Sequence, residues 1–294
     1  MFFKVPYSNN KSYIFTAGFY QQKSSIVKAV KMKKITIRKC SFNVSDNNLE
    51  FWGKVEKNTW ERDTFNIFDR FIDSDTVYFD IGAWIGPTVL YAAQLAKKAF
   101  AFEPDPVAFG ILKENTELNV SAGWSNRITL YNKAVAIEEG FMNIGSKSGG
   151  GDSLSSSLFA DKETSWKVET VAIPALIESN GLKGNKMLFK IDIEGGEYTL
   201  IPSLNKTLSE NNAVLFLSFH PGNLFASLNN GNKDFLKKIS FWREVIMTHC
   251  RIIRALPFRF RYLQSGRGLT ILNLLYYTVR LRSFSIVASN DRWS

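Results

Sequence analysis

One stretch decides the fold of this chain, and it reads Thr76-Val77-Tyr78-Phe79-Asp80-Ile81-Gly82-Ala83-Trp84-Ile85-Gly86-Pro87. Its first half predicts a short buried strand, which ends at an acid and a glycine turn. Pro87 suits the first turn of a helix, because the amide that proline lacks has no partner there, and an apolar stripe continues to Ala96. Strand, glycine turn and helix begin a nucleotide-type site, where small residues let a ligand approach the backbone amides.

A second acid lies at the end of the next predicted strand. The apolar residues 99–102 predict that strand, and Glu103-Pro104-Asp105 follows it. A carboxylate at the tip of the second strand is where such folds bind a ribose diol, about 20 residues beyond the first acid. Asp80 and Glu103 therefore predict a nucleoside bound across the carboxyl ends of adjoining parallel strands.

The spacing of the glycines separates two classes of cofactor. A dinucleotide site needs the pattern G-x-G-x-x-G, which admits a pyrophosphate. Here the pattern is Asp80-x-Gly82-x-x-x-Gly86, with the bulky Trp84 at the second glycine position, so a dehydrogenase is the least favoured class. An acid on the first strand suits a cationic cofactor without phosphate, and S-adenosylmethionine has both properties. A purely structural turn is the alternative, since many α/β proteins carry one.

Composition and length set the broad class. A chain of 294 residues with 45% hydrophobic residues and a mean hydropathy of -0.12 predicts a soluble protein with one domain and elaborations. No apolar run has the length of a membrane span, and the N-terminus lacks the features of a signal peptide. Cys40 and Cys250 show no metal or redox spacing, which predicts free thiols and a cytoplasmic location.

The net charge of +10 is concentrated at the two ends of the chain. Residues 1–50 hold nine Lys/Arg against Asp46 and Glu50, and residues 251–294 hold eight Arg against Asp291. Basic flanks of this kind can contact a polyanion or a membrane surface. A solvated basic face without a partner is the more common explanation.

Two later segments carry candidate chemistry. The apolar strand predicted over 187–193 runs into Asp192, Glu194 and Glu197, three carboxylates that repel one another unless a cation lies between them. The strand predicted over 214–219 ends at His220, which lies at the same ligand edge and has the pKa range of a general base. A structural histidine is the alternative, and Glu197 can also serve the start of a helix.

Four motifs carry a resemblance to a known family. They are Phe79-Asp80-Ile81-Gly82-Ala83, Ala101-Phe102-Glu103-Pro104-Asp105-Pro106, Glu114-Asn115 with Asn119, and Lys190-Ile191-Asp192-Ile193-Glu194-Gly195-Gly196-Glu197. Together they resemble the FkbM family of S-adenosylmethionine-dependent methyltransferases, and the last motif is the most specific. Trp60-Glu61 upstream and Ser285-Ile286-Val287-Ala288 near the end also look like family elements. The match covers residues 58–225 well and the tail loosely. Two positions depart from the family pattern: Trp84 replaces an Asn, and Ser218 replaces an acid before the histidine.

The resemblance implies an α/β protein with the class I methyltransferase (Rossmann-like) fold. That fold has a seven-stranded, mostly parallel sheet with helices on both faces and an antiparallel strand at one edge. We expect a basic N-terminal extension over 1–57 and a methyltransferase domain over 58–294. Within the domain, the Gly/Ser-rich loop 145–157 is expected to be a lid over the ligand edge rather than an insertion without function, and 251–294 a basic elaboration.

Position and resemblance together predict the site residues. The cofactor is expected to contact Glu61, Asp80, Gly82, Ala83, Gly86, Glu103, Pro104, Asn132, Ala134 and Asp192. The first glycine turn would hold the methionine end, Glu103 the ribose, and Asn132 and Ala134 would border the adenine. Asp192, Glu194 and His220 are the expected catalytic residues. No metal is predicted, although clustered carboxylates can bind Mg²⁺.

The resemblance also implies O-methylation of a hydroxyl on a sugar, glycan or secondary metabolite. The enzyme must align that hydroxyl with the methyl group for in-line transfer and remove its proton. A nucleic-acid methyltransferase that uses the basic flanks is one alternative, although no Asn/Asp-Pro-Pro-aromatic motif follows the fourth strand. A non-catalytic binding protein on the same scaffold is another. Neither the acceptor nor the oligomeric state follows from the sequence.

Overall fold

The computed structural model describes residues 32–293 except 146–150, 152–164 and 232–233, and the described residues belong to one compact unit. The strands are β1 (Met32–Ile37), β2 (Cys40–Ser45), β3 (Val77–Ile81), β4 (Lys98–Phe102), β5 (Ile128–Tyr131), β6 (Ala134–Ala136), β7 (Gly140–Gly145), β8 (Ser165–Ala172), β9 (Lys186–Ile191), β10 (Asn212–Phe219), β11 (Phe260–Leu263) and β12 (Phe284–Ser289). The helices are α1 (Leu49–Glu56), α2 (Arg62–Phe71), α3 (Pro87–Leu95), α4 (Pro106–Glu117), α5 (Ile173–Ser179), α6 (Glu197–Glu210), α7 (Pro221–Asn229), α8 (Phe235–Ala255) and α9 (Ile271–Val279).

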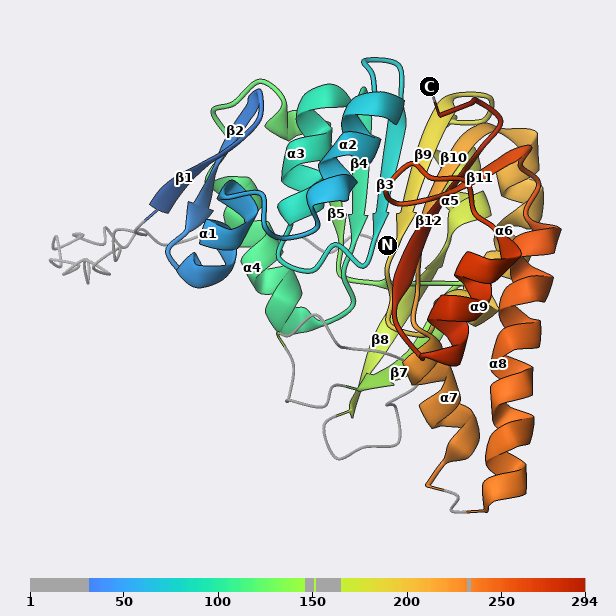
Figure 1. Ribbon diagram of the computed structural model, residues 1–294. Coiled ribbons are helices and arrows are strands. Elements are labelled where there is room, and N and C mark those ends of the chain that lie inside the picture. The colour runs from blue at the N-terminus through green and yellow to red at the C-terminus, as the bar shows by residue number, and fades with distance from the viewer. Residues whose placement is uncertain (1–31, 146–150, 152–164, 232–233, 294) are drawn as a thin grey trace, which may run out of the picture. The chain divides into compact units, whose positions relative to one another are not determined.

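The main sheet has seven strands in the order β11-β12-β10-β9-β3-β4-β5 (Figure 1). All neighbouring strands from β10 to β5 pair in parallel, and β12 pairs antiparallel with both β10 and β11. The predicted class I methyltransferase fold with its mostly parallel seven-stranded sheet is thus confirmed. One detail differs: the antiparallel strand lies one position in from the edge, because β11 pairs along its outer side.

Alternating side chains of the central strands fill a core on each face of the sheet. Val77, Phe79 and Ile81 point to one side, where α5, α6 and α8 supply the other half of the core. Tyr78 points to the opposite side and packs with α2 and α3. In the first core the ring of Phe79 stacks on that of Phe189, with 4.6 Å between centroids. Helices on both faces are therefore confirmed, and the ligand edge stays open at the carboxyl ends of the strands.

The described part of the predicted extension, residues 32–57, packs on the domain. Phe42 and Trp52 are buried in the same core as α3. Asn119 fixes the hairpin by accepting from the backbone N–H of Asn43 at 2.8 Å and donating to its carbonyl at 2.8 Å. The hairpin β1–β2 and α1 therefore cover apolar surface that the domain would otherwise expose. Residues 1–31 lie outside the described residues.

A small second sheet, in the order β6-β8-β7, flanks the predicted lid. β8 pairs in parallel with β6 and antiparallel with β7, so the strands on either side of residues 146–164 form one ladder. Of the predicted lid 145–157, only Gly145 and Gly151 belong to the described residues. The lid function stays a prediction.

The basic C-terminal region 251–294 completes the main sheet. It contributes β11 and β12, with α9 between them. Thr270 caps the N-terminus of α9, and its hydroxyl and the Asn273 side chain form a reciprocal cap. Among the helices that the structure describes, none combines the length and the apolar character that crossing a bilayer requires.

Candidate functional site

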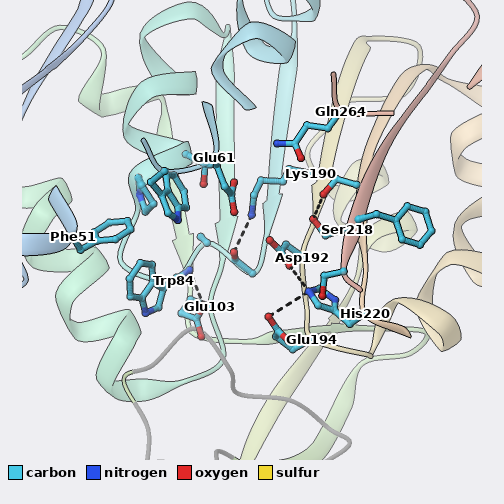
Figure 2. A pocket seen from close by; sticks show the side chains of 18 residues that line it. Phe51, Glu61, Trp84, Glu103, Lys190, Asp192, Glu194, Ser218, His220 and Gln264 are labelled. Atoms are coloured by element: carbon cyan, nitrogen blue, oxygen red, sulfur yellow. Dashed lines mark hydrogen bonds and ion pairs between the residues drawn. The ribbon is translucent and has the colours of Figure 1, made fainter. Parts of the chain in front are cut away.

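A cavity of about 490 Å³ opens at the carboxyl ends of β3, β9 and β10 (Figure 2). Parallel strands in this fold gather their functional side chains at that edge. The cavity is lined by Phe51, Trp60, Glu61, Gly82, Ala83, Trp84, Pro87, Thr88, Glu103, Lys190, Asp192, Glu194, Ser218, His220, Gln264, Ser283, Phe284 and Ser285. Five of the predicted cofactor-binding residues and all three predicted catalytic residues are among them.

The glycine turn after β3 is held against two neighbouring strands. The amides of Gly82 and Ala83 both donate to the carbonyl of Phe102 at 3.0 Å, and Gly82 has a φ of 84°. A Cβ at position 82 would lie 2.0 Å from the carbonyl oxygen of Asp192. Glycine is required here because the backbones after β3 and β9 touch.

Substituting Gly82→Ala is expected to lower the free energy of unfolding by about 2–5 kcal/mol, since the new Cβ meets backbone and the φ is left-handed. Urea denaturation followed by circular dichroism measures the change. Gly110→Ala is the matched control, because nothing lies within 4 Å of a Cβ there and alanine in a helix is better by about 0.5–1 kcal/mol. Equal stability of the two variants would contradict the close approach.

The carboxylate of Glu103 is presented at the tip of β4. It accepts from the backbone N–H of Trp84 and from that of Asp105, each at 2.8 Å. Burial raises the pKa of Glu103 to about 7, although the two amide hydrogen bonds act in the opposite direction. Asn132 donates to the Glu103 carbonyl at 2.8 Å and thereby fixes the turn. Asn132 supports the loop and is not among the residues that line the cavity.

Asp80 lies behind the cavity rather than on its wall. It is fully buried, accepts from the hydroxyl of Thr88 at 2.6 Å and pairs with Lys190 at 3.3 Å. Asp80 and Gly86 are not among the residues that line the cavity. Asp80 thus holds Lys190 and the start of α3 in place, and its predicted contact with the cofactor stays a prediction.

Lys190 begins the most specific of the four motifs but was not predicted to be a site residue. Its ammonium donates to the carbonyl of Gly82 at 3.2 Å, and it is opposite Asp80 in the register of β3 and β9. Burial works to lower the pKa of Lys190, but Asp80, Asp192 and Glu61 together raise it. The sequence held one signal for this residue. Lys190 is a single lysine in a strand that was predicted to be buried, and the strand predicted over 77–81 carries a single acid, Asp80.

Glu61 faces the cavity from the start of α2. Its carboxylate accepts from the hydroxyl of Thr64 at 3.0 Å. Burial, and then the charge of Asp192, raise the pKa of Glu61 to about 7, while Lys190 acts against them. A cation bound beside Glu61 would favour its ionised form.

The three predicted catalytic side chains meet at the cavity wall (Figure 2). Nε2 of His220 lies 3.4 Å from Oδ1 of Asp192 and 3.3 Å from Oε1 of Glu194. Burial alone lowers the pKa of His220, but the hydrogen bond to Glu197 and the charges of Asp192 and Glu194 raise it to about 9. Burial also raises the pKa of Glu194. The three donor atoms lie within 4.8 Å of one another, a spacing that permits a cation, and the prediction of no metal stays a prediction.

These pKa values predict how stability depends on pH. In the folded protein the pKa of His220 is about 9, so its proton stabilises the fold. This contribution to the free energy of unfolding is complete below pH 6.5 and is lost as the pH rises through 9. The pKa values of Glu61 and Glu103 are about 7 in the folded protein, so these carboxyls also bind more protons in the folded state than in the unfolded state. We therefore expect the free energy of unfolding to fall between pH 6.5 and 9 by roughly 1–3 kcal/mol. Urea midpoints across this range measure it, and a flat profile would contradict the cluster.

A second cavity, of about 460 Å³, shares Gly82 with the first. Its lining is mainly apolar and includes the predicted adenine neighbours Pro104 and Ala134, together with Ile193, Met142 and Leu200. Pro104 lies just beyond β4 and Ala134 begins β6 just beyond β5, so both lie at the carboxyl ends of adjoining strands. An apolar cavity beside Glu103 suits a flat heterocycle.

Several lining residues had no signal in the sequence. Phe51 comes from α1, and its ring lies 4.6 Å from that of Trp84 between centroids. Gln264 directly follows β11 and also lines the cavity. These residues are far from the motifs along the chain, so only the fold brings them to the site.

Comparison with known proteins gives matches of three kinds. Residues 80–249 match the family described as the methyltransferase FkbM domain. The chain is 41% identical over 54 residues to the uncharacterized protein MJ1452 of Methanocaldococcus jannaschii, a match that spans 18% of this chain and 21% of that protein. Methyltransferase FkbM from Methylobacillus flagellatus is 14% identical, with a TM-score of 0.41, over 83% of this chain and 56% of that one.

A further solved structure, SMU.1697c of Streptococcus mutans in complex with SAH, is 10% identical with a TM-score of 0.40 over 76% of this chain and 92% of that one. The family match covers most of the main sheet and the residues that line the cavity from β3, β4, β9 and β10. It also covers more than half of the 294 residues. The chain therefore belongs to the FkbM family of methyltransferases.

Proposed function

We propose that this methyltransferase transfers a methyl group from S-adenosylmethionine to a hydroxyl of a small-molecule or glycan acceptor, such as a sugar or secondary metabolite. One observation carries the proposal: the glycine turn, Glu103 and the Asp192–Glu194–His220 group line a single cavity. That arrangement brings a nucleoside site and proton-accepting groups within reach of one ligand.

The residues present fit the cofactor in three respects. The carboxylate of Glu103 can accept from both hydroxyls of a ribose, and the apolar second cavity beside Pro104 can take an adenine. Glu61 and Asp192 add negative charge near the glycine turn, which favours a cationic sulfonium and an ammonium group. The buried ammonium in this wall, Lys190, is already paired with Asp80. These acids would repel a pyrophosphate, which supports a cofactor without phosphate.

S-adenosylmethionine supplies a methyl carbon on cationic sulfur, so that the acceptor oxygen forms the new O–C bond while the C–S electron pair leaves with sulfur. The residues of this chain orient the hydroxyl, exclude water and take its proton. We assign the hydroxyl to the wall formed by Asp192, Glu194 and His220. Phe51, Trp60 and Trp84 form an aromatic wall near the glycine turn, which excludes water.

Thermal unfolding with ligands tests the choice of cofactor. S-adenosylmethionine at about 100 times its dissociation constant should raise the melting temperature by about 5–10 °C, whereas NAD⁺ should leave it unchanged. An acceptor screen with a labelled methyl donor, including sugars and RNA, then tests the class of acceptor. Stabilisation by NAD⁺ alone, or label transferred only to RNA, would contradict the proposal.

A further inference from the structure

The imidazole of His220 is enclosed by carboxylates on both of its ring nitrogens. Nε2 faces Asp192 and Glu194 at 3.4 and 3.3 Å, and Nδ1 faces Oε1 of Glu197 at 3.2 Å. The side chain of His220 is only 9% exposed. Each ring nitrogen therefore faces a carboxylate oxygen, and among the contacts of the described residues no protein group donates a hydrogen bond to either nitrogen.

Glu197 fixes the ring from the side away from the cavity. It is the first residue of α6 and is fully buried. Its Oε1 also accepts from the backbone N–H of His220 at 2.9 Å, and its Oε2 accepts from the N–H of Gly195 at 2.6 Å. Both oxygens therefore serve donors, so the carboxylate can meet Nδ1 of His220 only as an acceptor.

This geometry decides the protonation of the imidazole. A neutral ring carries one N–H and one lone pair. With Nδ1–H donating to Glu197, the lone pair on Nε2 would face the oxygens of Asp192 and Glu194 at 3.3–3.4 Å. In the other tautomer the lone pair on Nδ1 would face Oε1 of Glu197 at 3.2 Å, so a carboxylate repels a lone pair in either case. A proton on both nitrogens removes that repulsion, and the raised pKa of His220 agrees with it. An imidazolium has no lone pair with which to take a proton from an acceptor.

We propose that Glu197 is a positioning residue that holds His220 as an imidazolium against Asp192 and Glu194, so that a carboxylate of this pair, and not the imidazole, takes the proton of the acceptor hydroxyl. The choice of proton acceptor rests on the proposed function. The hydroxyl proton passes to the carboxylate as the O–C bond forms and the C–S bond breaks, and it then leaves to solvent. Both N–H bonds of His220 stay intact.

Glu194 is the better proton acceptor of the pair. Asn223 donates to its Oε2 at 2.8 Å and His220 faces its Oε1, so the carboxylate is held in one orientation. Burial raises the pKa of Glu194 above that of an ordinary glutamate, which makes it a stronger base near neutral pH. His220 acts through Glu194 by fixing its place and charge.

Nitrogen NMR of the imidazoles tests the protonation directly in the full chain without ligands. The chain has only two histidines. The other, His249, lies with Nδ1 2.7 Å from the carbonyl of Val245, and burial lowers its pKa to about 4, so it serves as a neutral reference. At pH 7.5 we expect His220 to show two protonated nitrogens and His249 one. A bare nitrogen on His220 at that pH would overturn the proposal.

Glu197→Gln separates positioning from a purely structural role. A glutamine must turn its NH₂ toward either Gly195 or His220, so one donor there loses its acceptor. We expect the midpoint of the His220 titration to fall by about one pH unit or more and kcat to fall about tenfold to a hundredfold, with KM little changed. Glu197→Asp keeps the negative charge, so we expect its His220 midpoint and its kcat to lie between those of Glu197→Gln and those of the wild type. Glu210→Gln, exposed at the other end of α6, is the control.

Two further results would contradict the proposal. An unchanged His220 titration in a folded Glu197→Gln variant overturns it, and if that variant does not fold, the wild-type spectrum and Glu197→Asp decide. Added MgCl₂ should leave both imidazole signals unchanged, and loss of the Nε2 proton would identify a metal site instead. Because the NMR experiment contains no cofactor or acceptor, failure of the proposed function would leave its result intact.

Discussion

Replacing Glu194 with glutamine is expected to lower kcat by about 10²–10⁴-fold while the dissociation constant of S-adenosylmethionine stays nearly the same. The substitution keeps the size of the side chain and an oxygen that can accept from Asn223, which lies 2.8 Å away in the wild type. It removes the charge that takes the proton of the acceptor hydroxyl. Initial rates with the acceptor found by screening, together with calorimetry of cofactor binding, separate the two effects.

The alternative base gives a different pattern. If the imidazole of His220 took the proton, kcat of the wild type would keep rising with pH up to about 9, where His220 loses its proton. Glu194→Gln would then lower the pH at which kcat reaches half of its maximum, and it would leave most of the activity in place. Glu117→Gln, an exposed glutamate on α4, controls for the loss of one negative charge.

Glu103→Ala is expected to weaken binding of S-adenosylmethionine by about 10²- to 10⁴-fold. Two ribose hydroxyls donating to one carboxylate contribute about 1.5–3 kcal/mol each, because hydrogen bonds to a charged group are stronger than neutral ones. The variant also removes the acceptor that serves the amides of Trp84 and Asp105 in the wild type. Isothermal titration of wild type and variant measures the difference.

The same titration carries its own control. Glu117→Ala removes an exposed carboxylate from α4 and should bind like the wild type. Circular dichroism must show that Glu103→Ala is folded, since its two amides lose their partner. Wild-type affinity in a folded Glu103→Ala variant would mean that the ribose lies elsewhere.

Local patterns predicted the elements that build the site. The strand 77–81, the helix that begins at Pro87, and the strand that ends before Glu103 all occur as expected. Alternation, glycine turns and proline at a first helical position act over a few residues, so they can be read along the chain. The strands β6 and β7 and the helix α7 were not predicted; β6 and β7 both form by pairing with β8, which lies farther along the chain.

The sequence by itself determined the family, the α/β fold and the edge of the sheet at which the chemistry gathers, because these follow from local spacing and from motifs that adjoin strand ends. Only the tertiary structure decided which charges meet. It placed Asp80 against Lys190 instead of on the cavity wall, enclosed His220 between Glu197 and the pair Asp192 and Glu194, and brought Phe51 to the site. Register between strands and burial set these contacts, and both arise only when segments far apart in the chain pack together.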